Sequence, residues 1–285
     1  MKRSICSLIC VAVSALGGIT LLPALACSQD RLSHNSALTP LQREIAAQRA
    51  RLNSEDPEER RNALVHLGNL RRAESSRVAL VALNDSSALV RATAAHAVLS
   101  LPAPEVITAL VPLLADKSEF VRQSAAYSLG MTRSRGAVEH LVARLMSDKD
   151  HGVRGAAAVA LGHIRDESAV TPLVAILSRD LVIVKPGKNK KSDDKKDNEF
   201  VLRAAARALG EIRSRAGVPA LIRALADEGN ADDVRREAAQ ALGWIGDTAA
   251  EPALRAVLGA SDPYLAKFAK EALVRIQRTG ARPVM

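Results

Sequence analysis

One ten-residue phrase recurs along this chain of 285 residues. It reads VRQSAAYSLG at residues 121–130, VRGAAAVALG at 153–162 and VRREAAQALG at 234–243. With looser copies included, the phrase begins at Glu59, Val90, Val121, Val153, Val201, Val234 and Leu265. The intervals between these starts are 31, 31, 32, 48, 33 and 31 residues. A nearly constant period is typical of repeat arrays, in which each unit packs only on its neighbours, so the sequence predicts about seven stacked units.

Each unit is expected to hold two helices. Within the phrase, apolar residues stand at helical spacing, as at Val153, Ala157 and Leu161. Most copies end in Gly, which permits either a left-handed backbone at the helix end or a close helix crossing. These glycines are Gly68, Gly130, Gly162, Gly210 and Gly243. A second segment of helical spacing follows, at 137–148, 169–180, 217–227 and 250–259, with Pro172, Pro219 and Pro252 in its first turn.

The composition indicates how these helices would pack. Apolar residues make up 48% of the chain, yet Phe, Trp and Tyr together reach only 2%. The core must therefore consist of Ala, Leu, Val and Ile, which suit closely packed helices. Pairs of alanines inside the phrase, such as Ala125-Ala126 and Ala157-Ala158, would let neighbouring helices approach closely.

A charged motif precedes the phrase in three units. Asp and Arg occur in an Asp-x5-Arg pattern, and the pairs are Asp85/Arg91, Asp116/Arg122 and Asp148/Arg154. Together with the Ala-Ala and Leu-Gly positions, this pattern resembles the HEAT-repeat proteins, most closely the short phycobilisome-lyase-like type, over residues 54–278. The resemblance implies that these charges form a structural ladder between successive repeats. Two positions depart from the family pattern: Leu202 stands at the Arg place of the fifth unit, and Leu99 stands at the turn Gly of the second.

The expected fold is therefore all-α: a right-handed α-solenoid of about seven HEAT-like helix pairs. The proposed domain boundaries are a signal peptide at 1–26, a flexible tether at 27–38, a capping helix at 39–53 and the solenoid at 54–280. Thr39-Pro40 reads as an N-cap followed by Pro at the first position of the capping helix. The long interval contains KPGKNKKSDDKKDNE at 185–199, expected to be a disordered, solvated insertion. The alternative for this insertion is a basic arm that touches phosphates or anionic headgroups.

The N-terminus predicts export. Lys2 and Arg3 precede an apolar run at 5–22, and Ala24-Leu25-Ala26 has the small-x-small pattern that signal peptidase reads. The alternative is an uncleaved membrane anchor, because the apolar run is at the short edge of what spans a bilayer. Gly17, Gly18 and Pro23 favour a processed leader.

Cys27 would then be the first residue of the mature chain and its only cysteine. The stretch 24–27 resembles the lipobox of bacterial lipoproteins, in which this cysteine carries a lipid, although Ala24 takes the place where those boxes favour Leu. Ser28 after the cysteine implies, by the same resemblance, sorting to the outer membrane. We therefore expect a lipid-anchored protein of the bacterial cell envelope that faces the periplasm. The alternative is ordinary cleavage that leaves a free thiol on Cys27.

The search for reactive groups finds no catalytic motif, so no catalytic residue, cofactor or metal is expected. The histidines are scattered along the chain: His34, His66, His96, His140, His151 and His163. The formal net charge of +9 suits anionic partners, but the arginines are dispersed and base-stacking aromatic residues are scarce, so nucleic acid is not expected. Trp244 and Tyr264 could mark a binding site late in the array, or they could pack between helices.

The remaining candidate for function is the surface. If the second helices line the concave side, their outward positions would contact a partner. These candidates are Glu105, Thr108, Glu139, His140, Arg144, Arg179, Arg223 and Arg255. The resulting prediction is a monomeric, non-enzymatic scaffold for protein–protein interaction in the envelope. The alternatives are a lyase-like protein that handles a tetrapyrrole chromophore or its carrier protein, as the resemblance implies, and a binder of anionic envelope polymers.

Overall fold

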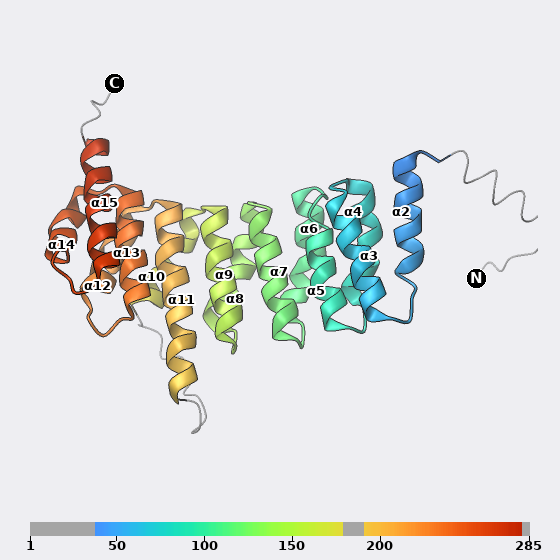
Figure 1. Cartoon of the computed structure of the whole chain (residues 1–285), viewed down its shortest axis with the longest axis horizontal. Coiled ribbons are helices and arrows are strands. Elements are labelled where there is room, and N and C mark those ends of the chain that lie inside the picture. Colours follow the sequence, from blue (N-terminus) through green and yellow to red (C-terminus); the bar gives the residue numbers. More distant parts are fainter. Residues whose placement is uncertain (1–37, 179–190, 281–285) are drawn as a thin grey trace, which may run out of the picture. The chain divides into compact units, whose positions relative to one another are not determined.

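The computed structural model describes residues 38–178 and 191–280, and every regular element within these ranges is a helix (Figure 1). The chain divides into two compact units after Glu44. Of the first unit, Leu38, Thr39 and the first residues of α2 (Pro40–Arg51) are described. The expected leader, Cys27 and nearly all of the tether lie outside the described residues. None of the described helices is long and apolar enough to cross a membrane.

Helix α2 starts where the sequence predicts the capping helix. The hydroxyl of Thr39 accepts a hydrogen bond from the Gln42 backbone N–H at 3.2 Å, and the Gln42 side chain accepts one from the Thr39 N–H at 3.0 Å. This reciprocal pair satisfies N–H groups that a helix start leaves without partners.

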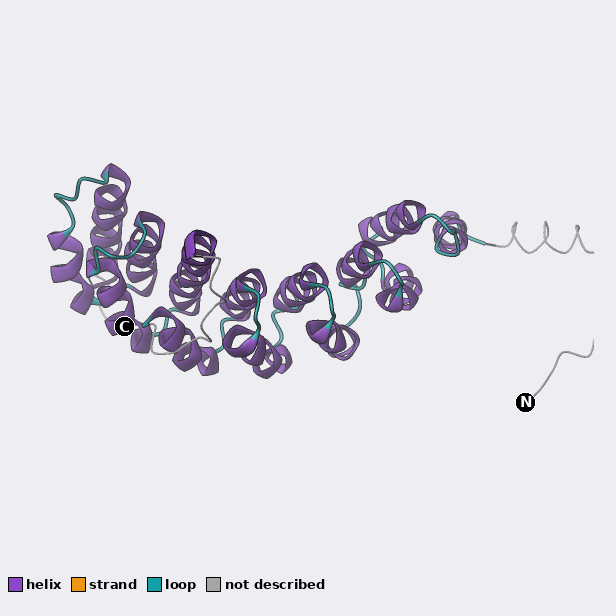
Figure 2. Ribbon diagram, turned by 90° about the horizontal axis from the view of Figure 1, so that it is seen from below, coloured by secondary structure: helices purple, strands orange, loops and turns teal. Residues whose placement is uncertain are grey.

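The seven copies of the phrase lie on seven helices, here called the first helices. They are α3 (Pro57–Asn69), α5 (Ala88–Ala97), α7 (Glu119–Met131), α9 (His151–Ile164), α11 (Lys191–Ile212), α13 (Asp232–Ile245) and α15 (Pro263–Gly280). The second helices alternate with them: α4 (Ala73–Ala79), α6 (Ala103–Leu110), α8 (Val138–Ser147), α10 (Val170–Leu177), α12 (Val218–Ala226) and α14 (Glu251–Ala256). Successive first helices pack on one another, and the second helices pack behind them (Figure 2). The fold is therefore an all-α HEAT solenoid.

The core is built from the same phrase position in unit after unit. The Leu before the terminal Gly is fully buried at Leu67, Leu129, Leu161, Leu209 and Leu242. Because these side chains are fully buried, truncation to Ala would cost about 2–5 kcal/mol through lost burial and a residual cavity.

The terminal glycines of the phrase serve a close helix crossing. A β-carbon on Gly210 would lie 2.7 Å from the Ala241 Cα of the next first helix, and one on Gly243 would lie 2.8 Å from the Ala272 Cα. The left-handed backbone, which was the other role expected of this Gly, occurs three residues after it. Positive φ angles occur there at Arg71, Arg133, Arg165, Arg213 and Gly246.

Arginines link several successive units through the loop before the next first helix. Arg91 donates two hydrogen bonds to the Asp116 carboxylate, both at 2.8 Å, and a third to the carbonyl oxygen of Asp85 at 2.8 Å. Arg122 pairs in the same way with Asp148 at 2.9 and 3.0 Å. The carboxylate of each Asp thus accepts hydrogen bonds from the Arg of the preceding unit. The backbone of the loop that carries this Asp accepts a hydrogen bond from the Arg of the same unit.

The ladder includes pairs that the Asp-x5-Arg motif does not contain. Arg60 pairs with Asp85, and Arg236 pairs with Asp262 near the C-terminus, in both cases through two hydrogen bonds. Hydrogen bonds from the arginines lower the pKa of Asp85, Asp116 and Asp262 below the usual value of a carboxyl group.

Arg154 departs from the pattern at the joint between α9 and α11. Its side chain is buried, its Nη2 lies 2.8 Å from His151 Nδ1, and its Nε has no hydrogen-bond partner. Burial lowers the pKa of this guanidinium. The motif supplies no Asp here, because Lys196 stands at the corresponding place. Phe200 packs on α9 instead, where a β-carbon on Gly155 would meet its ring at 2.0 Å.

The charged insertion is only partly as expected. Residues 185–190 lie outside the described part of the chain, and α11 begins at Lys191, so the first turns of this helix fall within the insertion. The sequence contains no Gly or Pro after Gly187 in this stretch, so nothing interrupts a helix that continues from the phrase.

Candidate binding pocket

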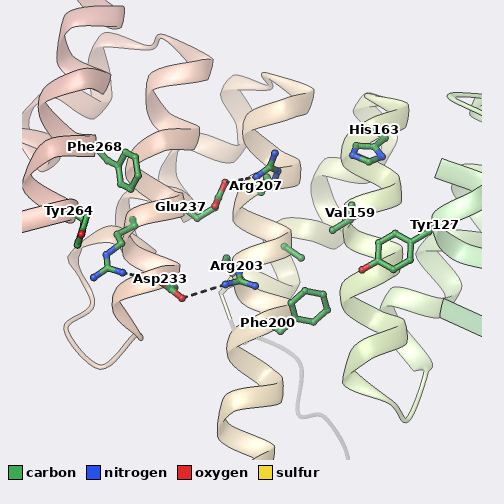
Figure 3. A pocket seen from close by; sticks show the side chains of 12 residues that line it. Tyr127, Val159, His163, Phe200, Arg203, Arg207, Asp233, Glu237, Tyr264 and Phe268 are labelled. Atoms are coloured by element: carbon green, nitrogen blue, oxygen red, sulfur yellow. Dashed lines mark hydrogen bonds and ion pairs between the residues drawn. The ribbon is translucent and has the colours of Figure 1, made fainter. Parts of the chain in front are cut away.

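A pocket opens across five first helices, α7, α9, α11, α13 and α15 (Figure 3). Its volume is about 640 Å³, within the range of small-molecule pockets. It is lined by Tyr127, Val159, His163, Phe200, Arg203, Ala204, Arg207, Asp233, Arg236, Glu237, Tyr264 and Phe268. We call it the aromatic–arginine pocket.

Aromatic side chains are concentrated in this pocket. The chain has one Trp, two Tyr and three Phe, and both tyrosines and two of the phenylalanines line the pocket. Trp244 lies beside it, under the guanidinium of Arg207. The packing core needs none of these rings because Ala and Leu fill it. Their concentration at one surface therefore indicates a binding role.

Three arginines of the pocket stack on aromatic rings. Arg203 lies 5.8 Å from the centre of the Phe200 ring, Arg207 lies 5.8 Å from that of Trp244, and Arg236 lies 5.2 Å from that of Tyr264. Stacking restricts each guanidinium to a plane and leaves its N–H groups directed outward from the edges.

Carboxylates hold the same arginines in place. Asp233 accepts hydrogen bonds from Arg203 at 3.4 Å and from Arg236 at 2.9 Å, which connects α11 with α13. Arg207 bonds to Glu211 at 3.0 Å on its own helix. These contacts preorganise the arginine side chains and reduce the ordering cost when a ligand binds.

Glu237 is less exposed than Asp233, the other acid of the pocket. Its Oε1 has no hydrogen-bond partner and lies 4.0 Å from Arg207 Nη1. Burial raises the pKa of Glu237 above the usual value of a glutamate, against the opposing effects of Arg207 and Arg203. Glu237 thus places an acceptor with unused capacity inside the pocket.

All twelve lining residues occupy equivalent positions of the repeat. Each is the residue before the phrase, its third, fourth or seventh residue, or the residue directly after it. Helical geometry puts these positions on one face of each first helix. Sequence reasoning missed the pocket because it assigned the binding surface to the second helices. Tabulating the aromatic residues by repeat position would have found it.

The predicted partner residues lie on the other set of helices. Glu105 and Thr108 are on α6, Glu139, His140 and Arg144 on α8, Arg223 on α12 and Arg255 on α14, while Arg179 lies outside the described residues. None of the seven described candidates lines the pocket. Several have local partners instead: Glu105 pairs with Arg77 at 3.7 Å, and Arg223 donates to the Ser178 hydroxyl at 2.8 Å.

The two interpretations of the late aromatic residues apply to different residues. Trp244 is partly buried and packs against α11, where a β-carbon on Gly210 would meet its ring at 2.8 Å. Tyr264 is 60% exposed and lines the pocket. Among the described residues there is no cluster of three side chains suited to a metal ion.

The comparison with solved structures finds proteins of similar fold, whereas the comparison with curated proteins finds no match. No curated protein matches the sequence significantly. The solved structure of the YibA protein of Escherichia coli has 17% identity and a TM-score of 0.56, with 92% of this chain and 100% of that chain covered. The CpcE–CpcF complex of phycocyanin lyase from Nostoc sp. PCC7120 has 23% identity, a TM-score of 0.49 and coverage of 93% and 97%. Human deoxyhypusine hydroxylase has 19% identity, a TM-score of 0.40 and coverage of 90% and 92%.

The likeness to YibA concerns the fold alone. The family of HEAT repeats matches this sequence at residues 45–130, 120–184 and 194–274, which together cover most of the chain. The described residues of these ranges form the stacked helix pairs and the arginine ladder. The chain therefore belongs to the HEAT-repeat family.

Proposed function

We propose that this protein is an exported, lipid-anchored scaffold of the bacterial cell envelope that binds a protein partner in the aromatic–arginine pocket. The observation that carries the binding role is the gathering of both tyrosines, two phenylalanines and three arginines at one surface. Tyr, Trp and Arg are the residues that contribute most to protein–protein affinity. Membership of the HEAT family supports a scaffold, because stacked helix pairs offer long binding surfaces.

Binding through the pocket is tested by affinity capture from envelope extract with defined variants. Tyr264→Ala removes an exposed ring, and Val81→Ala is the matched control because Val81 is 69% exposed outside the pocket. The expected result is one specific partner captured by the parent and by Val81→Ala, with a loss of at least fivefold for Tyr264→Ala. Equal capture by all three proteins would contradict the assignment of the site. Circular dichroism checks that each variant remains folded.

Export and anchoring form the second part of the proposal. They are supported by the basic start, the apolar run and the lipobox-like stretch that ends at Cys27. Mass spectrometry of the protein from its native membrane should show an acylated N-terminal cysteine, and Cys27→Ala should lose the acyl mass. An unmodified N-terminus in the parent protein would end the anchor proposal and leave the scaffold proposal intact.

A second candidate function is binding of a flat conjugated ligand that carries carboxylates, such as a tetrapyrrole. The pocket supports it by its volume of about 640 Å³ and by aromatic rings beside arginines. The purified protein should show visible absorbance if this candidate is right, and Arg203→Gln with Arg207→Gln should reduce it.

A further inference from the structure

The face that forms the aromatic–arginine pocket continues beyond the pocket onto α7 and α5. Phe120, Tyr127 and Met131 stand at i, i+7 and i+11 on α7 and therefore share one face, on which Tyr127 lines the pocket. Phe120 is 49% exposed and Met131 is 59% exposed. Leu89 on α5 occupies the repeat position of Phe120 and is 39% exposed. We call this continuous surface the first-helix face.

The charge of the first-helix face changes along the array. At the five repeat positions that define it, the second, third and fourth phrases contain no Asp, Glu, Lys or Arg. The same positions in the fifth, sixth and seventh phrases contain the pocket arginines and their carboxylate partners. A partner that follows the face would meet an uncharged half and a charged half.

The width of the face suits a single extended chain. The residues directly before the phrase form one row across the stacked first helices, and the seventh residues of the phrase form a second row. Seven helical residues separate the two rows by about 10 Å along the helix axis. Between the rows lie small buried residues, Ser124, Ala156 and Ala204. An extended backbone needs about 5 Å between neighbours, whereas a helix with its side chains is about 10–12 Å wide. The extended chain fits between side chains that project from both rows.

The stacking distance sets the period of such a chain. Packed helices lie about 8–10 Å apart, and the first helices follow one another in contact from α3 to α15. An extended or polyproline-like chain advances about 3.1–3.4 Å per residue. A chain that crosses the first helices therefore reaches a new helix about every three residues.

The arginines of the charged half have donors to spare. Among the described contacts, Arg203 donates one side-chain hydrogen bond, to Asp233, and Arg207 one, to Glu211, although each guanidinium has five N–H groups. Their side chains are 45% and 51% exposed. Stacked, fixed and accessible guanidinium groups are suited to carboxylates.

From these observations we infer that the first-helix face binds an extended segment of a partner polypeptide. The segment places an apolar side chain about every third residue over α5, α7 and α9, and acidic side chains over Arg203 and Arg207. This inference rests on the proposed protein-binding function and specifies the kind of partner.

The test uses fluorescein-labelled synthetic peptides of 18 residues and the purified full chain, with fluorescence anisotropy as the readout. The main peptide has Leu at every third position of one half and Glu at every third position of the other, separated by Ser and Gln. It is made in both block orders because the direction of the chain is not specified. Three further peptides have Leu and Glu at every second position, Lys in place of Glu, or Pro at several spacer positions.

The expected result is that one block order of the main peptide binds at least tenfold more tightly than the two-residue-period and Lys peptides. The Pro peptide should bind within threefold of it, because an extended chain accepts Pro and a helix does not. The variant Arg203→Gln with Arg207→Gln should weaken binding at least tenfold. The control Arg135→Gln with Arg215→Gln loses the same charge at arginines that are 87% and 85% exposed outside the pocket, and it should bind as the parent does.

Four results would overturn the inference: no binding by any peptide, equal binding at both periods, preference for Lys, or loss of binding with Pro. If the captured envelope partner still depends on Tyr264, any of these results rejects the extended segment while protein binding in the pocket stands. If capture does not depend on Tyr264, the proposed function itself fails.

Discussion

Gly130 on α7 and Ala160 on α9 are so close that a β-carbon on Gly130 would lie 2.6 Å from the Ala160 Cα. Two successive first helices therefore meet backbone to backbone at this point. The repeated Leu-Gly of the phrase is explained by this contact, because any larger residue would push the neighbouring unit away.

Gly130→Ala should destabilise the protein by about 2 kcal/mol, because overpacking against the backbone exceeds the gain in helix propensity of about 1 kcal/mol. Urea denaturation followed by circular dichroism measures the change. Gly259→Ala is the control, since a β-carbon there would have no neighbour within 4 Å, and its effect should stay within about 0.5 kcal/mol. A neutral Gly130→Ala would show that the crossing can relax.

Arg91→Met and Arg154→Met should have different consequences, although both arginines occupy the same repeat position. Arg91→Met leaves the Asp116 carboxylate without its partner and should cost about 3 kcal/mol. No carboxylate of the described residues is bonded to Arg154, and Met would remove a buried charge, so stability should remain or rise by about 1 kcal/mol. Equal losses in chemical denaturation would mean that Arg154 has a stabilising partner.

The ladder predicts loss of stability in acid. The pKa values of Asp85, Asp116 and Asp262 are lower in the folded chain than in the unfolded chain, so the unfolded chain binds more protons at low pH. Their contribution is complete above about pH 5 and decreases as the pH falls through the folded pKa values. Denaturation at pH 7, 5 and 3 should show this decrease. Asp116→Asn should reduce the pH dependence, and an unchanged slope would contradict the assignment.

The ionisation of Glu237 should lower the stability of the fold, whereas ionisation of the ladder aspartates raises it. Burial raises the pKa of Glu237 in the folded chain, so its ionisation costs stability as the pH rises through that value. Glu237→Gln should therefore be more stable than the parent at pH 7, with the difference disappearing at pH 4. Thermal denaturation at both pH values measures this. Glu139→Gln, at an exposed position on α8, should show no such difference. A Glu237→Gln variant that is less stable at pH 7 would show that the ion pair with Arg207 outweighs burial.

Arg165→Gly should stabilise the chain by about 1 kcal/mol, because Arg165 has a φ of 60° and non-Gly residues are strained in this region. Gly246→Ala is the reverse change at the equivalent position, where φ is 77°, and should destabilise by a similar amount. Melting temperatures of the two variants test the pair. The same sign for both would contradict the strain argument.

Much of the fold could be predicted because the repeat carries its own local signals. Helical spacing, Leu-Gly at the helix end and Pro in the second helix are properties of short stretches, and the structure has helices where they predict them. The sequence did not predict that α11 extends into the charged insertion. A segment rich in Lys and Asp has the composition of a disordered segment, and composition alone does not reveal a helix there.

The site was harder to predict, because a single sequence does not show which face of a helix pair remains open. The resemblance implied a ladder between successive repeats but not which residues pair; Arg91 reaches Asp116 and Arg122 reaches Asp148, one unit further along. Tyr264 stands out in the sequence as one of two tyrosines, but it lines the same pocket as Phe200 and Tyr127 only because α7, α11 and α15 contribute to one surface.

The sequence by itself determined that this protein is a stack of helix pairs, because period, apolar spacing and small residues act over a few neighbouring positions. Only the tertiary structure decided which residues meet across units. Stacking sets the helix spacing at backbone contacts such as Gly130 with Ala160, and that spacing brings aromatic rings and arginines from separate repeats into one pocket.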